Sequence, residues 1–354
     1  MNTRVIGIRS IFAKLIKAIK WLLISLVVLL LMAFVLESYL KHEDLQKFPP
    51  PGKLFQVNGH KMHIWCEGSG NPTIVLDAGA SMFSTGWRWV MPELSQATKV
   101  CAFDRSGLGW SETGAAPYDG ITAAEELHQL LEKANVKKPF IYVGHSLGGN
   151  LGQIYYQHYP SDLKALVMVE AADPAMLIND LGEMKDEKIQ RGKQITDCGV
   201  RCFMTSFVSS IGVIRITMAQ LEIVNNPLFN AQALAEYKAR TNRLENLHFL
   251  AQRGKYLTEI MFQNLDGNGF GDLPLATIYS ENRGELLGVF ENEEEMFESR
   301  KEDLVAWQKT LDSSTHSLGF TEIRDANHLS MVMHQEPASK VSERILEVFQ
   351  TVAR

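Results

Sequence analysis

The chain has 354 residues, of which 45% are hydrophobic and 21% are charged, a balance typical of a globular protein with a substantial core. Its net charge of −6 gives no basis for binding nucleic acid, so that class of function is set aside. The length allows one large α/β domain or two smaller ones.

The N-terminus has the charge pattern of a membrane anchor. Residues 1–20 carry five basic side chains and no acidic one, and sixteen uncharged residues, 21–36, follow them. A spanning helix needs about 20 apolar residues, and apolar positions just before Trp21 supply the missing length. A secretory signal peptide has the same layout, but the residues after Leu31 lack a small-x-small cleavage site. We predict an uncleaved signal anchor within residues 1–46, with a cleaved signal as the rival interpretation.

The same charges predict an orientation. Basic residues precede the apolar segment, whereas Glu37, Glu43 and Asp44 follow it. The positive-inside rule then puts the N-terminus in the cytoplasm and the remaining chain on the extracytoplasmic side, periplasmic or extracellular. In such an oxidising compartment an even number of cysteines fits two disulfides, although buried free thiols remain the alternative. The four are Cys66, Cys101, Cys198 and Cys202.

Residues 47–52 include three consecutive prolines and are expected to form a stiff linker. From residue 53 onward, short β-rich runs alternate with segments of helix length, which indicates a mostly parallel sheet covered on both faces. The predicted strands are 53–59, 61–68, 72–79, 99–104, 140–145 and 165–170, and the predicted helices are 121–135 and 147–159.

The alternation stops between residues 174 and 271, where the pattern predicts several helices and no strand. It resumes with a strand over 273–280, a helix near 297–312, a strand over 318–326 and a helix from about 336. A helical insertion between strands of a parallel sheet predicts a cap over their carboxyl ends, the edge where open α/β sheets bind ligands. The expected organisation is therefore a core of 53–173 and 272–354 with a cap of 174–271.

Residues 144–148 read Gly-His-Ser-Leu-Gly, between a predicted strand and a predicted helix. In the G-x-S-x-G pattern the two glycines let neighbouring backbone pass close to a strained turn, which exposes the serine hydroxyl. The N–H of Leu147 begins the helix and points toward the same space. The pattern predicts Ser146 as a nucleophile.

Together with "DRSGLGWS" at 104–111 and "DANHLS" at 325–330, this motif makes residues 53–352 resemble the α/β-hydrolase superfamily, in particular its capped esterase-like branch. The resemblance implies an eight-stranded, mostly parallel sheet with a helical cap inserted after strand 6. It implies no metal and no organic cofactor. Because the family's second and fourth strands are neighbours, it also implies a disulfide between Cys66 and Cys101.

A serine hydroxyl needs a base to accept its proton. The resemblance assigns that role to His328, in the loop after the last predicted strand. It also assigns two backbone donors for a developing oxyanion, the N–H of Leu147 and the N–H of Ala80. Where relatives often have His-Gly before the second donor, this chain has Ala78-Gly79. Asp77 is expected only to hydrogen-bond its own loop.

The acid partner of His328 departs from the usual pattern. Most relatives place it after the strand predicted at 273–280, where this chain has Arg283. Some relatives place it at the end of the preceding strand, which here ends in Glu170. A carboxylate that closes an apolar strand is costly to bury without a role, so we predict Glu170. The alternatives are Asp173, Glu281 and Glu285.

These residues predict a membrane-anchored serine hydrolase that cleaves an ester-like bond of a small or lipid-like acyl substrate through an acyl-enzyme. In the same fold, dehalogenases and epoxide hydrolases carry an aspartate at the nucleophile position, so Ser146 argues against both. Aminopeptidase-like amide cleavage and other serine-triad hydrolysis remain alternatives. A further alternative is not an enzyme: the chain could be a non-catalytic interaction protein of the cell envelope. An unreactive Ser146 in the folded protein would favour this alternative.

Overall fold

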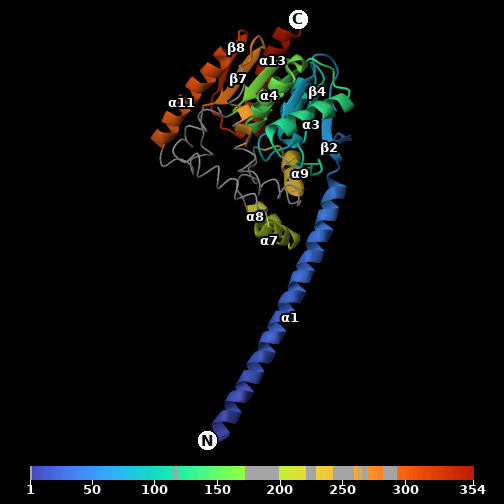
Figure 1. The fold of residues 1–354 in the computed structure, drawn as a ribbon, viewed down its shortest axis with the longest axis vertical. Coiled ribbons are helices and arrows are strands. Elements are labelled where there is room, and N and C mark those ends of the chain that lie inside the picture. Colours follow the sequence, from blue (N-terminus) through green and yellow to red (C-terminus); the bar gives the residue numbers. More distant parts are fainter. Residues whose placement is uncertain are drawn as a thin grey trace.

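The computed structural model describes an N-terminal helix and the larger part of an α/β domain (Figure 1). The described residues are 2–114, 118–171, 199–220, 229–241, 259–261, 263–264, 269–281 and 293–354. The predicted positions Asp173, Arg283, Glu285 and Cys198 lie outside these ranges, so the structure does not place them.

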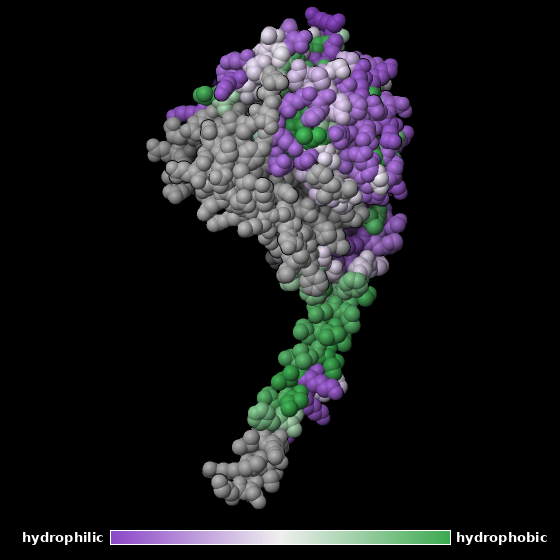
Figure 2. Space-filling view, viewed as in Figure 1, coloured by the Kyte–Doolittle hydropathy of each residue, from purple (hydrophilic) through white to green (hydrophobic). Residues whose placement is uncertain are grey.

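Helix α1 (Asn2–Lys47) carries the apolar N-terminal segment away from the domain (Figure 1). It is longer than the sixteen uncharged residues, because Leu, Lys, Glu and Gln continue the helix until it ends shortly before Pro49. Over Phe12–Lys47 it is long and apolar enough to cross a membrane, and its most apolar part is not buried in the protein. Figure 2 shows this hydrophobic surface beginning just below the domain.

Eight strands form one sheet in the order β1-β2-β4-β3-β5-β6-β7-β8. Strands β3 to β8 run parallel, whereas β2 is antiparallel to both β1 and β4. The prediction of an eight-stranded, mostly parallel sheet is confirmed. The strands are β1 (Lys53–Val57), β2 (His60–Glu67), β3 (Ile74–Asp77), β4 (Val100–Phe103), β5 (Phe140–His145), β6 (Leu163–Val169), β7 (Leu275–Ser280) and β8 (Ser317–Ile323).

The pairing of β2 with β4 explains the disulfide. Cys66 stands directly opposite Cys101 in the antiparallel register, and their Cα atoms are 4.0 Å apart. The two sulfurs are bonded, as the strand order of the superfamily implied.

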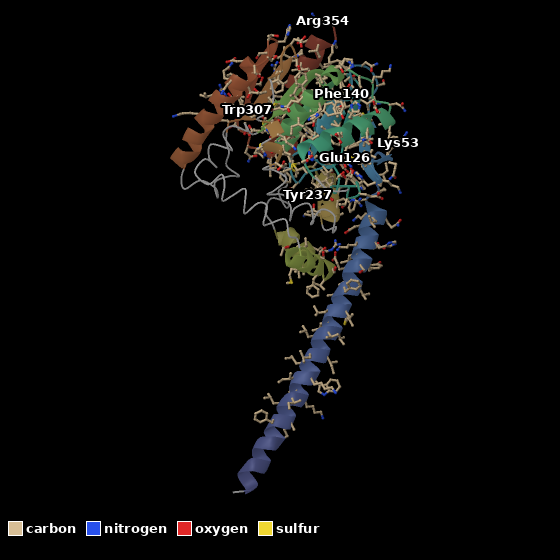
Figure 3. All side chains as sticks on the ribbon, in the orientation of Figure 1. Lys53, Glu126, Phe140, Tyr237, Trp307 and Arg354 are labelled. Carbon is tan, nitrogen blue, oxygen red and sulfur yellow. A yellow bond between two sulfur atoms is a disulfide. The ribbon has the colours of Figure 1, made fainter. Side chains whose placement is uncertain are left out.

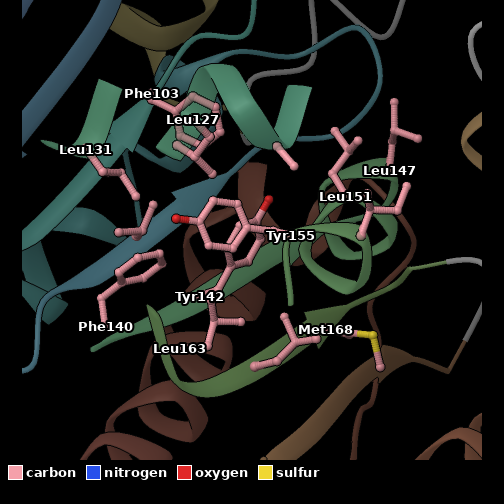
Figure 4. Close-up of a cluster of buried hydrophobic side chains, with 14 of the residues drawn as sticks. Phe103, Leu127, Leu131, Phe140, Tyr142, Leu147, Leu151, Tyr155, Leu163 and Met168 are labelled. Carbon is pink, nitrogen blue, oxygen red and sulfur yellow. The ribbon is translucent and has the colours of Figure 1, made fainter. Parts of the chain in front are cut away.

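Helices cover both faces of the sheet, as the near-continuous apolar strands predicted. One face packs against α3 (Gly120–Lys133) and α4 (Leu147–His158), whose side chains surround Tyr142 of β5 (Figure 4). The other face packs against α2 (Met91–Leu94) and α13 (Gln335–Val352). The remaining elements outside the cap are η1 (Ser84–Trp87), η2 (Pro160–Asp162), α11 (Glu293–Asp312) and α12 (Ser330–Met333).

The described part of the segment between β6 and β7 includes three named helices: α7 (Gly199–Ser210), α8 (Val213–Gln220) and α9 (Ala231–Thr241). Buried Glu236 of α9 fastens this segment to the domain, because it pairs with Arg88 and accepts a 2.7 Å hydrogen bond from Thr85. Tyr237 stacks on Phe83, with ring centroids 5.7 Å apart (Figure 3). Helix α9 therefore packs on η1, the segment that follows the carboxyl end of β3.

Candidate active site

The turn between β5 and α4 has the geometry that the G-x-S-x-G pattern predicts. Ser146 adopts φ 53° and ψ −123°, a left-handed conformation that few non-glycine residues adopt. Two backbone bonds hold it there: its N–H donates to Val169 O at 2.8 Å, and its carbonyl accepts from Gly149 N at 2.9 Å. We call residues 144–148 the elbow.

The loop that follows β3, residues 78–80, lies against the elbow. A Cβ built on Gly79 would stand 3.5 Å from Cβ of Ser146, and one on Gly148 would stand 2.5 Å from Asp77 O. The second distance is too short for a side chain, so glycine at position 148 allows α4 to begin beside this loop. The structure thus brings Leu147, at the start of α4, and Ala80 to the same side of the sheet as Ser146.

Arg105, from the "DRSGLGWS" segment, binds the backbone of the 78–80 loop and holds it in place. Its guanidinium donates to Ala78 O at 2.6 Å and to Gly79 O, and it pairs with the carboxylate of Asp77. The other Asp77 oxygen accepts a 2.7 Å bond from the Tyr142 hydroxyl. Burial raises the pKa of Asp77, although Arg105 and Tyr142 oppose the rise. Asp77 has the structural role expected of it, but the brace from Arg105 was not predicted.

His328 lies in the loop after β8, next to the elbow. Its backbone carbonyl accepts a hydrogen bond from Nε2 of His145 at 2.8 Å, and the two rings are 4.9 Å apart. Burial, and then the charge of His328, lower the pKa of His145 to about 3. His145 is therefore neutral at ordinary pH with its proton on Nε2, which makes it a donor that holds the loop of His328.

Glu170, directly after β6, faces the ring of His328. Oε2 of Glu170 lies 3.5 Å from Nδ1 of His328, and Oε1 accepts the backbone N–H of Ser280. The residue has a φ of 51° and is 7% exposed, so the strand end turns sharply to direct a buried carboxylate toward His328. A long contact of this kind commonly shortens when substrate binds.

Of the alternative acids, only Glu281 lies within the described residues. It is exposed, and its Oε2 accepts the backbone N–H of Asp325 at 3.1 Å. This contact stabilises the turn after β8, and His328 follows Asp325 by three residues. Among the residues that the structure describes, Glu170 is thus the carboxylate that faces the His328 ring.

Two positioning residues, His145 and Arg105, escaped the sequence analysis. The histidine stands inside the elbow motif at a position that the pattern leaves free. Its partner is the carbonyl of a residue 183 positions away, so no local pattern reveals the bond. The "DRSGLGWS" motif did signal Arg105, but only as part of a family signature without a stated contact.

The comparisons with known proteins agree with this architecture. A family model described as "alpha/beta hydrolase fold" matches residues 72–195. The Bacillus subtilis (strain 168) protein YbdG is 28% identical over 206 residues, which cover 56% of this chain and 63% of YbdG. The chain spans less than two thirds of the length of YbdG and of the curated relatives that follow it.

Solved structures resemble the domain over nearly their whole length. The epoxide hydrolase CorEH superposes with a TM-score of 0.59 at 18% identity, over 85% of this chain and 98% of CorEH. A thermophilic esterase from Thermogutta terrifontis gives a TM-score of 0.57 at 16% identity, over 85% of this chain and 99% of the esterase. At these identities the likeness shows the fold. The match over residues 72–195, the eight-stranded sheet and the superposed structures together show that the chain has the α/β-hydrolase fold.

Proposed function

We propose that this α/β-hydrolase is a membrane-anchored serine hydrolase that cleaves ester bonds of acyl substrates through an acyl-enzyme. The observation that carries the proposal is the contact between Glu170 and His328 beside the Ser146 elbow. A serine, a buried carboxylate and a histidine in this chain order match the constellation used for acyl transfer in this fold.

In the proposed reaction, Oγ of Ser146 attacks the carbonyl carbon while His328 takes the hydroxyl proton. The carbonyl oxygen becomes an oxyanion that accepts hydrogen bonds from the N–H groups of Leu147 and Ala80. When this intermediate collapses, His328 gives the proton to the leaving alcohol and the acyl group remains on Ser146. His328 then takes a proton from a water that attacks the acyl carbon, and returns this proton to Oγ of Ser146 as the carboxylic acid leaves. Glu170 stabilises the charged imidazole in both steps.

Epoxide hydrolysis is the competing chemistry, because CorEH shares the fold. In that class an aspartate attacks the epoxide carbon, and this chain has Ser146 at the position concerned. Fold likeness at 18% identity carries no substrate, so the residue at the elbow decides between the two. Serine favours acyl transfer.

A fluorophosphonate probe tests the catalytic part of the proposal. The folded full chain in detergent is expected to be labelled at Ser146, and Ser146→Ala to remain unlabelled. His328→Ala should slow labelling strongly, because the hydroxyl then has no base. An unlabelled Ser146 in the folded native chain would exclude the serine hydrolase and favour the non-catalytic alternative.

The proposed anchor is α1, with the N-terminus in the cytoplasm and the hydrolase domain outside. Support comes from the five basic residues before the apolar segment and the acidic residues after it. The chain should remain in the membrane after alkaline carbonate extraction. An impermeant protease added to right-side-out membrane vesicles should then degrade the domain, whereas protection of the domain would reverse the orientation.

A further inference from the structure

One face of α1 changes polarity abruptly near residue 36. Val27, Leu30, Leu31 and Phe34 recur at a spacing of three or four residues, so they share a face of the helix. The next residues along that face are charged: Glu37, Lys41 and Asp44. If α1 crosses a bilayer, this change marks the boundary between acyl chains and headgroups.

Cap helices α7 and α8 lie beside this face, on the side of the domain from which α1 leaves (Figure 1). At the charged part, buried Glu37 accepts hydrogen bonds of 2.9 and 3.1 Å from Arg215 of α8. Arg215 also pairs with Asp44 at 2.9 Å, and Lys41 donates to Ser209 Oγ of α7 at 2.9 Å. These contacts fix the cap helices at a defined height along α1.

At the apolar part of the same face, α7 contributes to a shallow groove. Phe207 and Ile211 line it together with Leu30 and Phe34 of α1. Phe207 is 40% exposed, and Met204, one helical turn earlier on α7, is 49% exposed. The polarity boundary of α1 therefore continues onto the cap. Charged contacts lie on the side of the boundary toward the domain, and exposed apolar side chains lie on the side toward the N-terminus of α1.

The height of this groove corresponds to the outer part of a hydrocarbon core. From Leu30 to Glu37 a helix rises about 10 Å, at about 1.5 Å per residue. Amphipathic helices that bind a membrane surface bury their apolar face roughly 5–10 Å into the boundary between headgroups and acyl chains. Phe207, which lines the groove with Leu30 and Phe34, thus lies at the depth where such a helix contacts lipid.

We propose that α7 docks into the phospholipid leaflet that α1 crosses, with Met204 and Phe207 among the acyl chains, and that the hydrolase takes its acyl substrate from this leaflet. The delivery step rests on the proposed function. A series of contacts connects the leaflet with the site: α7 and α8 bind α1, α9 packs on η1, and η1 follows the 78–80 loop. An amphiphile with a long acyl chain is the substrate class that fits.

Exposure of an apolar side chain does not by itself indicate lipid contact. Val305 of α11 is 72% exposed, more than Met204 or Phe207, but α11 lies on the far side of the domain from α1 (Figure 1). The proposal depends on the position of Phe207 beside the apolar face of α1 and on the exposure of Met204 on the same helix. Val305 therefore provides a control that is equally apolar and lies away from the leaflet.

Labelling by a photoactivatable phospholipid tests the docking without any substitution. The full chain is reconstituted in phosphatidylcholine vesicles that contain a phosphatidylcholine with a diazirine in its acyl chain. After irradiation, the tryptic peptide of residues 202–215 should carry lipid in addition to peptides of α1, and the peptide of residues 302–309, which contains Val305, should not. Label confined to α1, or label in both peptides alike, would overturn the docking.

Kinetics test the delivery. Phe207→Glu should lower hydrolysis of a long-chain ester embedded in vesicles by about tenfold, because a charge replaces an aromatic ring in lipid. It should leave hydrolysis of a short, water-soluble ester unchanged, and Val305→Glu should change neither rate. Equal loss on both esters, or no loss on either, would overturn delivery from the leaflet. If the native chain hydrolyses neither ester, the proposed function is wrong, and the lipid labelling still decides the docking.

Discussion

The carboxylate of Glu170 and the ring of His328 face each other, with Oε2 of Glu170 3.5 Å from Nδ1 of His328. They lie far apart in the sequence, one directly after β6 and the other in the loop after β8. The second carboxylate oxygen accepts a hydrogen bond from the backbone N–H of Ser280, so β7 holds the carboxylate in its orientation toward His328. Under the proposed function this carboxylate is the acid, one strand earlier than the position that the family most often uses.

Replacing this acid tests its role. Glu170→Gln should lower kcat for a short-chain ester by about 10³- to 10⁴-fold, because the amide no longer stabilises the imidazolium form of His328. Glu281→Gln is the matched control: its exposed side chain contacts the backbone of Asp325, and kcat should stay within about twofold. The opposite order of losses would move the acid to Glu281.

The brace from Arg105 predicts a loss of turnover without a loss of binding. Arg105→Lys keeps the charge but has a single ammonium, which cannot hold Asp77, Ala78 O and Gly79 O together. The 78–80 loop should loosen, and kcat should fall about ten- to a hundredfold, less than for loss of an oxyanion donor itself, with KM little changed.

The control for this prediction is Arg344→Lys. Arg344 also donates to a backbone carbonyl, that of Leu318, but on α13 and away from the elbow. Its replacement should leave kcat unchanged. A rise in KM at constant kcat in Arg105→Lys would contradict a role in positioning the loop.

His145 predicts an acid-sensitive contribution to stability. Its pKa in the folded protein is about 3, below the ordinary value of 6.5, mainly because of burial. Its contribution to stability is therefore complete above about pH 6.5 and is lost progressively as the pH falls toward 3, because the unfolded chain binds the proton more readily. The free energy of unfolding should lose at most about 1.4 kcal/mol per pH unit from this residue.

Urea unfolding of the full chain in detergent between pH 7 and pH 5 measures this effect. His145→Gln removes the titrating group, so the variant's stability should fall less steeply with pH than that of the native chain, whatever its stability at pH 7. Parallel pH dependences in the two proteins would show that His145 does not titrate on unfolding in this range.

The disulfide predicts a cost for its removal. Cys66 and Cys101 are 35 residues apart, and closing a loop of that length stabilises a folded chain by roughly 3–4 kcal/mol in the chain-entropy account. The double variant Cys66→Ala/Cys101→Ala should unfold at lower urea concentration, with a somewhat steeper slope because its unfolded chain is less compact. Peptide mapping without reductant should recover the two residues in one linked fragment, and recovery of both as free thiols would contradict the prediction.

Local patterns predicted the parts of this molecule that depend on neighbouring residues. The glycines around Ser146 predicted the elbow, and the near-continuous apolar strands predicted a sheet covered on both faces. The carboxylate at the end of an apolar strand singled out Glu170. The Cys66–Cys101 bond needed the strand order of the superfamily, because nothing near either cysteine shows that β2 and β4 are neighbours.

Contacts between distant segments could not be predicted in this way. His145 holds the carbonyl of His328, and Glu37 pairs with Arg215 across 178 positions of sequence. Each partner alone resembles an ordinary polar residue. The predicted anchor segment, residues 1–46, nearly coincides with α1, because helix propensity continues beyond the apolar residues to Lys47.

Helix α1 enters the domain without a break in its helical backbone before Lys47, and the Glu37–Arg215 pair joins it to the cap. Under the proposed anchoring, the enzyme and a leaflet substrate meet by lateral diffusion in one plane. The reaction rate should then follow the mole fraction of substrate among the lipids. Diluting the same vesicles into a larger volume of buffer should leave the turnover per enzyme unchanged.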